Sequence, residues 1–287
     1  MATLGPYSLD VVDHELRRAD PVLRRKLRAR LAAIGYPELD VIPFLDRAAI
    51  LSRYELPADR PIIVFSTANT FRAHGAADHR AAALEARFRG WRPWSRRALR
   101  ALPFAFTRGP ILPYRRYLAT IRALAGANGA YVVAKSRVKH DDPPYVGDYV
   151  DRVVEDVSFF PATSLELLSV ASLNVNFIST TALEAIACGC PTLAVWQLPL
   201  ERMIEPVSAR FGRRYCFDPG SFANSPGASE LIDGTSAAGA SRLSALATAS
   251  LADLRGDATA REAALDRFLA VRGKSSAAFL DAVAALA

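Results

Sequence analysis

Cysteine, lysine and long apolar runs are scarce in this chain, and these scarcities limit the classes of protein to which it can belong. The three cysteines follow no disulfide framework, so we expect reduced thiols in a cytosolic protein. Cys188 and Cys190 are separated by one residue and have no histidine nearby, which predicts packing residues rather than a metal site. No run of about 18 apolar residues occurs, and the first residues lack an apolar core, so we expect neither a membrane-spanning helix nor a secretory leader.

Short motifs of metal and nucleotide chemistry are also missing. The sequence contains no HExxH, CxxC or GxxxxGK[ST] segment, so it gives no support to the metalloprotease and P-loop classes. We therefore expect no metal site and no cofactor.

Positive charge is in excess, and arginine supplies nearly all of it. The net charge is +7 and the pI is about 9.6, while only four of the 36 basic residues are lysines. This excess of positive charge favours an anionic partner. The candidates are a nucleotide, a phosphorylated lipid, a membrane surface or a nucleic acid. Hydrophobic residues make up 51% and charged residues 23% of the chain, which is typical of a globular protein.

The most informative stretch predicts a βαβ unit. Residues 173–178 read as a short buried strand, and hydroxyl residues fill 179–181. Residues 182–187 have helix composition, and residues 192–195 read as a strand again. The start of such a helix suits a phosphate, and Glu184, one turn later, can accept hydrogen bonds from sugar hydroxyls. The alternative is that the hydroxyls only cap the helix and Glu184 is only a solvated helix residue.

The rest of the chain predicts strands that alternate with helices, and hence an α/β fold with a Rossmann-like, doubly wound parallel sheet. We expect residues 1–58 to form an N-terminal helical segment, 59–240 a nucleotide-binding domain with a helical insertion at 75–128, and 241–287 C-terminal helices. The predicted helices are 9–34, with a break near Pro21, 163–171, capped by Thr163 or Ser164, and 200–211. The predicted strands are 62–65, 131–134, 153–159 and 214–217. Residues 218–240 are predicted to be loop.

Four segments, in this order, resemble the donor-binding C-terminal domain of GT-B glycosyltransferases. They are GYPELD at 35–40, PIIVFSTANTFR at 61–72, AKSRVKH at 134–140 and STTALEAIACGCPTLAV at 179–195. The resemblance is nearest to bacterial surface-polysaccharide enzymes and CDP-glycerol glycerophosphotransferases. It covers residues 30–230.

The resemblance implies a transferase that uses a nucleotide-activated sugar or CDP-alcohol as substrate, needs no metal, and acts in cell-surface glycan or polymer synthesis. It implies these donor-binding residues: Ser179, Thr180, Thr181, Glu184, Arg72, Lys135, Lys139 and His140. The chain departs from the family where Asn176 stands in place of the first of two glutamates and Asp141 in place of a proline.

The general base is not identified by any motif. His74 and His79 are candidates because histidine titrates near neutral pH, with surface loop residues as the alternative. The segments that match the donor domain begin near residue 35, so we expect a partner chain to supply the acceptor domain. Two rival hypotheses remain, a sugar-nucleotide 2-epimerase-like enzyme and a non-catalytic nucleotide-binding subunit of a split transferase.

Arginine and aromatic residues are interleaved between residues 80 and 122. Eleven arginines stand against one acid, Glu85, among seven tryptophans, phenylalanines and tyrosines. This composition fits an anionic membrane surface or a lipid-linked acceptor, and a nucleic-acid patch less well. The alternative is a helical hairpin whose aromatics pack on the sheet. On the membrane hypothesis the protein is cytoplasmic and peripheral on the inner face of the membrane.

Overall fold

The computed structural model describes residues 2, 3, 5, 6, 9, 20–29, 31–67, 114–136, 142, 144–156, 161–177, 179–196, 221–234 and 236–285. Its elements are β1 (Ala2–Thr3), α2 (Pro21–Arg28), β2 (Ala32–Ala33), the 3-10 helix η1 (Pro37–Phe44), α3 (Arg47–Arg53), β3 (Ile62–Ser66), α6 (Tyr114–Ala127), β4 (Tyr131–Lys135), the 3-10 helix η2 (Pro144–Asp148), β5 (Arg152–Val154), α7 (Thr163–Val170), β6 (Leu173–Asn176), α8 (Thr181–Ala187), β7 (Thr192–Trp196), β8 (Ser229–Asp233), α11 (Ala237–Leu246), α12 (Ala258–Phe268) and α13 (Ser275–Ala284).

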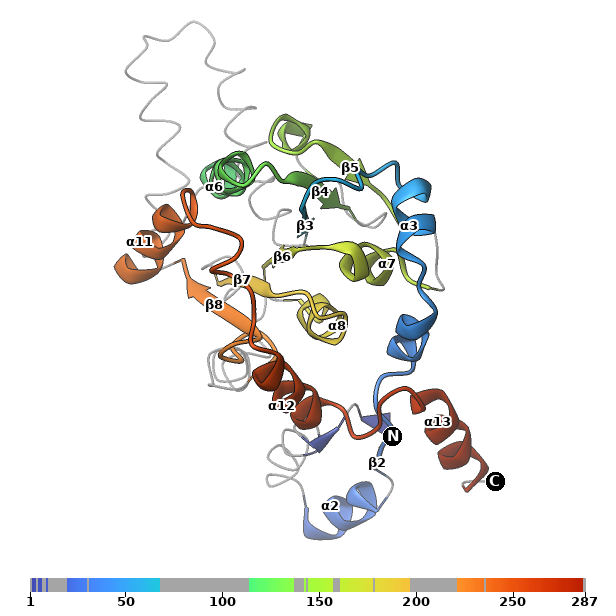
Figure 1. Cartoon of the computed structure of the whole chain (residues 1–287). Coiled ribbons are helices and arrows are strands. Elements are labelled where there is room, and N and C mark those ends of the chain that lie inside the picture. The colour runs from blue at the N-terminus through green and yellow to red at the C-terminus, as the bar shows by residue number, and fades with distance from the viewer. Residues whose placement is uncertain are drawn as a thin grey trace, which may run out of the picture.

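Six parallel strands form the centre of the fold, in the order β5-β4-β3-β6-β7-β8 (Figure 1). The chain starts this sheet at β3, builds outward through β4 and β5, and then returns to add β6, β7 and β8 on the other side of β3. This is the usual strand order of a dinucleotide-type doubly wound sheet. The fold class predicted from the sequence is confirmed.

Helices cover both faces of the sheet, so the central strands are buried on both faces. On one face, α6 and α11 pack over a cluster that contains the edge-to-face rings of Phe65, Tyr117 and Phe177. On the other face, α3, α7 and α8 pack over Ile62 and Val64, and α12 packs against α8. The strand register therefore fixes which side chains face which helical layer.

The βαβ unit predicted from the sequence is present as β6, α8 and β7, and the strands predicted at 62–65 and 131–134 are present as β3 and β4. The predicted helix at 200–211 and strand at 214–217 lie outside the described residues. The domain boundaries remain a prediction, although α11 begins before residue 241 and packs against β8 and α6.

Four secondary-structure predictions were wrong. Residues 218–240 contain β8, an edge strand that the sequence does not predict, because Glu230 and Asp233 give it a composition typical of a loop. The predicted helix at 9–34 is replaced in part by β2, which pairs with β1. The helix α7 has Ala162 at its N-cap position with no side-chain cap, and β5 ends at Val154.

The segment at 35–40 holds the C-terminal helix α13 in place. Gly35 has a φ of +79°, and a Cβ at this position would lie 2.3 Å from the carbonyl oxygen of Val271, so glycine is required. The Asp40 carboxylate accepts hydrogen bonds from the backbone N–H of Ser275 at 3.1 Å and of Ser276 at 2.7 Å. These two contacts fasten η1 to the start of α13 across most of the length of the sequence.

Candidate functional site at the carboxyl edge of the sheet

The strand order creates one topological switch point, between β3 and β6. The connections leave these two neighbouring strands in opposite directions. In open α/β sheets, a switch point of this kind forms a crevice outside the carboxyl ends of the strands. Ligands of open α/β sheets bind in such crevices. The last residues of β3, β4 and β6 therefore define the candidate site.

A row of three polar side chains ends these strands. Ser66 is in register with Lys135 on one side and with Asn176 on the other, and residues in register on parallel strands point to the same face. All three are buried, with relative exposures of 4% for Ser66, 5% for Lys135 and 0% for Asn176. Because burying polar groups costs free energy, a cation, a hydroxyl and an amide at this edge call for a functional explanation.

Asn176 is the most unusual member of this row. Neither the oxygen nor the nitrogen of its side-chain amide has a hydrogen-bond partner among the described residues. Two residues earlier on the same face, Asn174 accepts a hydrogen bond from Ser66 Oγ at 3.3 Å and donates one to Thr192 Oγ1 at 3.2 Å. The contrast shows that the sheet can satisfy a buried asparagine, and that it does not do so at the carboxyl edge.

Lys135 carries the positive charge of the row and is already paired. Its Nζ forms an ion pair with the carboxylate of Asp156, which follows β5 and is partly exposed. The backbone N–H and the hydroxyl of Thr67 both donate to the Lys135 carbonyl oxygen at 3.0 Å and tie the ends of β3 and β4 together. An anion that binds here would share the ammonium group with Asp156.

The hydroxyl turn before α8 closes the other side of the site. Ser179 Oγ accepts a hydrogen bond from the Thr181 N–H at 3.3 Å, whereas Thr180, at the N-cap position, makes no side-chain cap. Thr181 is buried, and its hydroxyl has no hydrogen-bond partner among the described residues. The helix has only seven residues, so its dipole adds little, and the polar side chains matter more.

Glu184 is buried, with 6% exposure, and the alternative that it is a solvated helix residue is wrong. The Tyr36 hydroxyl lies 3.3 Å from Glu184 Oε1 and 3.1 Å from Glu38 Oε2. Burial, followed by the charge of Glu184, raises the pKa of the nearby Cys188 thiol to about 12. That thiol is protonated at neutral pH and is not a nucleophile.

The other predicted site residues, Arg72, His74, His79, Lys139 and His140, lie outside the described residues, and their roles remain predictions. Ser66, Asn176 as a site residue, and Tyr36 were not predicted. A polar residue at the last position of a buried strand was the available signal for Ser66 and Asn176. In the described ranges, no group of three or more His, Cys, Asp or Glu residues lies close enough to hold a metal ion.

The part of the arginine-rich segment that the structure describes belongs to α6. Tyr117 is fully buried in the core, so for this residue the alternative of an aromatic that packs on the sheet is correct. Arg115 lies over the ring of Tyr145, and Arg122 pairs with Asp151 at 2.8 Å. No helix in the described part of the chain has both the length and the apolar composition that crossing a bilayer requires.

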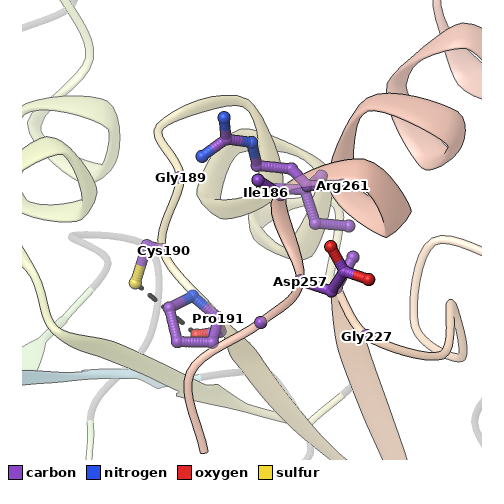
Figure 2. A pocket seen from close by; sticks show the side chains of 10 residues that line it. Ile186, Gly189, Cys190, Pro191, Gly227, Asp257 and Arg261 are labelled. Carbon is purple, nitrogen blue, oxygen red and sulfur yellow. Dashed lines mark hydrogen bonds between the residues drawn. The ribbon is translucent and has the colours of Figure 1, made fainter. Parts of the chain in front are cut away.

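A small pocket lies at the opposite end of the sheet from the candidate site, between a turn and the start of a helix (Figure 2). It lies at the turn before β7 and the approach to β8, next to the start of α12. Figure 2 shows the Arg261 side chain reaching toward the turn at Gly189, where an added Cβ would lie 2.7 Å from Arg261 Nη1. This pocket is at the amino ends of the strands, away from the switch point.

No protein-family model matches the chain, and no curated protein sequence matches it significantly. Solved structures are similar at low identity. The wall teichoic acid polymerase TagF is 14% identical with a TM-score of 0.47, and the match covers 100% of this chain and 59% of TagF. ADP-heptose LPS heptosyltransferase II of E. coli is 13% identical with a TM-score of 0.31, covering 52% of this chain and 37% of that one.

The glycosyltransferase SnogD from Streptomyces nogalater is 17% identical with a TM-score of 0.33, and the match covers 79% of this chain and 44% of SnogD. The chain therefore spans well under two thirds of the length of each of these proteins. At such identities the likeness concerns the fold alone.

Proposed function

We propose that the chain is the donor-binding part of a GT-B-type transferase that uses a nucleotide-activated sugar or a CDP-alcohol in cell-surface glycan or polymer synthesis. The observation that supports this most is the buried polar row Lys135, Ser66 and Asn176 at the switch point. A diphosphate offers oxygens to the ammonium, hydroxyl and amide groups of this row.

In this proposal, the side chains of the carboxyl edge bind the diphosphate and stabilise the charge that develops on it as it leaves. Lys135 supplies the positive charge, Asn176 and the hydroxyls around Thr181 supply hydrogen bonds, and Glu184 accepts hydrogen bonds from ribose hydroxyls. An acceptor hydroxyl attacks the sugar carbon and the nucleoside diphosphate leaves; if the donor is a CDP-alcohol, the hydroxyl attacks the phosphorus that carries the alcohol and CMP leaves. In both cases the general base takes the proton of the hydroxyl. His74 and His79 are the candidates for the general base within this chain, and a partner chain would supply the acceptor domain.

Two other hypotheses keep the same site. A sugar-nucleotide 2-epimerase-like enzyme would bind the nucleotide and release an epimer without any acceptor. A non-catalytic subunit of a split transferase would bind the nucleotide and turn over only with its partner chain. The row at the carboxyl edge favours nucleotide binding in all three cases, so binding is tested first.

A thermal-shift panel of UDP, GDP, CDP and CMP tests the proposal, because a ligand that binds only the native state raises the melting temperature. At least one nucleotide should stabilise the wild type. Lys135→Gln should abolish or strongly reduce that shift, since it removes the cation of the site.

Arg242→Gln is the matched control, because Arg242 also pairs with a carboxylate, that of Glu230 at 2.6 Å. Arg242 lies on α11 and Glu230 on the edge strand β8, away from the switch point. The control should keep the full nucleotide shift. If no nucleotide stabilises the wild type, or if both variants lose the shift equally, the proposed site is wrong.

A further inference from the structure

One phenol lies between two carboxylates beside the proposed donor site. Tyr36 Oη is 3.1 Å from Glu38 Oε2 and 3.3 Å from Glu184 Oε1, and these three groups come from two segments far apart in the sequence. A phenol carries a single proton. Tyr36 can therefore donate one conventional hydrogen bond at a time, and Glu38 and Glu184 compete for it.

The two carboxylates have unequal surroundings. Glu184 is buried on α8, whereas Glu38 is exposed on η1. A hydrogen bond to a charged group counts for more where water is excluded, so the bond to Glu184 is the more valuable one. Burial, followed by the negative charges of Glu184 and Glu38, raises the pKa of Tyr36, so the phenol keeps its proton at neutral pH.

The scaffold, rather than Glu184, fixes the position of the phenol. Tyr36 lies between Gly35, which is packed tightly on the Val271 carbonyl, and Asp40, which caps α13. Its ring packs against the apolar cluster that joins α8 to α12. The following residue is Pro37, which holds Tyr36 in the extended conformation observed, with a φ of −125°.

We propose that Tyr36 is a positioning residue for Glu184: its phenol orients the buried carboxylate toward the hydroxyl groups of the donor, and Glu38 competes for the same proton. This inference rests on the proposed function, because it assigns the hydroxyl-binding role to Glu184. Its consequence is a preference for nucleotides with a ribose diol over those without one. Tyr36 itself touches Glu184 and not the reacting atoms.

Calorimetric titration of ribonucleotides against their 2′,3′-dideoxy forms tests this role. UDP, GDP and CDP are compared with the corresponding dideoxy diphosphates in the wild type and in Tyr36→Phe, which keeps the ring and removes only the hydroxyl. The wild type should prefer the ribonucleotide, and Tyr36→Phe should lower that preference about three- to tenfold, the scale of one ordinary hydrogen bond. Tyr131→Phe is the control, because Tyr131 is also half-buried but stands at the first position of β4, and it should leave the preference unchanged.

A double-mutant cycle with Glu38→Ala separates positioning from simple charge repulsion. Removing Glu38 leaves the phenol proton to Glu184, so the ribose preference should rise in the wild-type background. In the Tyr36→Phe background, Glu38→Ala should not change the preference.

The outcomes separate the two claims. If a ribonucleotide binds but Tyr36→Phe keeps the wild-type preference, or if Glu38→Ala has the same effect in both backgrounds, the positioning role is refuted and the donor site stands. If the wild type binds no nucleotide, the proposed function itself fails.

Discussion

Replacing Asn176 with valine is expected to stabilise the protein and to weaken ligand binding, two effects of opposite sign from one substitution. The Asn176 side chain is fully buried, and neither polar atom of its amide has a hydrogen-bond partner among the described residues. An unsatisfied buried polar group costs about 1–3 kcal/mol. Valine removes both polar atoms and suits a buried strand, so Asn176→Val should raise the free energy of unfolding by about 1–3 kcal/mol.

The matched control is Asn174→Val, two residues earlier on the same strand and the same face. Asn174 is equally buried but has hydrogen bonds to Ser66 and Thr192, and valine would leave both hydroxyls without these bonds. This variant should lower the free energy of unfolding by about 1–3 kcal/mol for each hydroxyl left unpaired.

Urea unfolding of the two variants and the wild type measures these changes, and thermal melting should show shifts of about 2–4 °C for each kcal/mol. The reasoning is refuted if Asn176→Val destabilises the protein as much as Asn174→Val does. It is also refuted if Asn176→Val gains stability but binds nucleotide as tightly as the wild type, because the amide would then have no role in the site.

Three further predictions concern other parts of the molecule. Burial would raise the pKa of Asp40, but the hydrogen bonds from the backbone N–H groups of Ser276 and Ser275 outweigh it, so this pKa is lowered in the folded state. Asp40→Ala should therefore lower the free energy of unfolding by about 1–2 kcal/mol at pH 7. Denaturant titrations should show this difference shrinking as the pH falls below about 4, because the wild-type carboxylate then gains a proton. Tyr54 donates a hydrogen bond to the buried Glu166 carboxylate, and burial, followed by this hydrogen bond, raises the pKa of Tyr54 to about 12. Tyr54→Phe should lower the free energy of unfolding measured in urea by about 1.5–3 kcal/mol. An unchanged free energy would contradict a role for this bond in joining α3 to α7. If residues 80–122 bind an anionic membrane, the protein should float with anionic vesicles at 0.1 M salt and not at 1 M salt. The reason is that the screening length falls from about 10 Å at 0.1 M to about 3 Å at 1 M. Flotation with neutral vesicles, or tighter binding to RNA than to anionic vesicles, would contradict this prediction.

The strands and helices of the core could be predicted from the sequence because their signals are local. β3, β4 and β7 are short, mostly apolar runs bounded by breakers, β6 alternates apolar residues with asparagines, and α8 follows a hydroxyl turn. The strand β8 could not be found in this way, because an edge strand with Glu230 and Asp233 has the composition of a loop.

The site itself depends on contacts that no local pattern contains. Lys135, Ser66 and Asn176 come together only through the register of β4, β3 and β6. The contact between Tyr36 and Glu184 joins residues 148 positions apart, and the pairing of Asp40 with α13 spans 235 or more. The motif at 35–40 was recognised, but its physical role, to fasten α13 and place Tyr36, could be seen only in the fold.

The most direct test of the central claim is to locate the bound nucleotide by hydrogen exchange. With the nucleotide that gives the largest thermal shift at saturation, amide protection should increase at the carboxyl ends of β3, β4 and β6 and around Thr181. It should not increase at the turn around Gly189, where the pocket of Figure 2 lies. Protection confined to that turn would place the ligand at the amino end of the sheet and contradict the account.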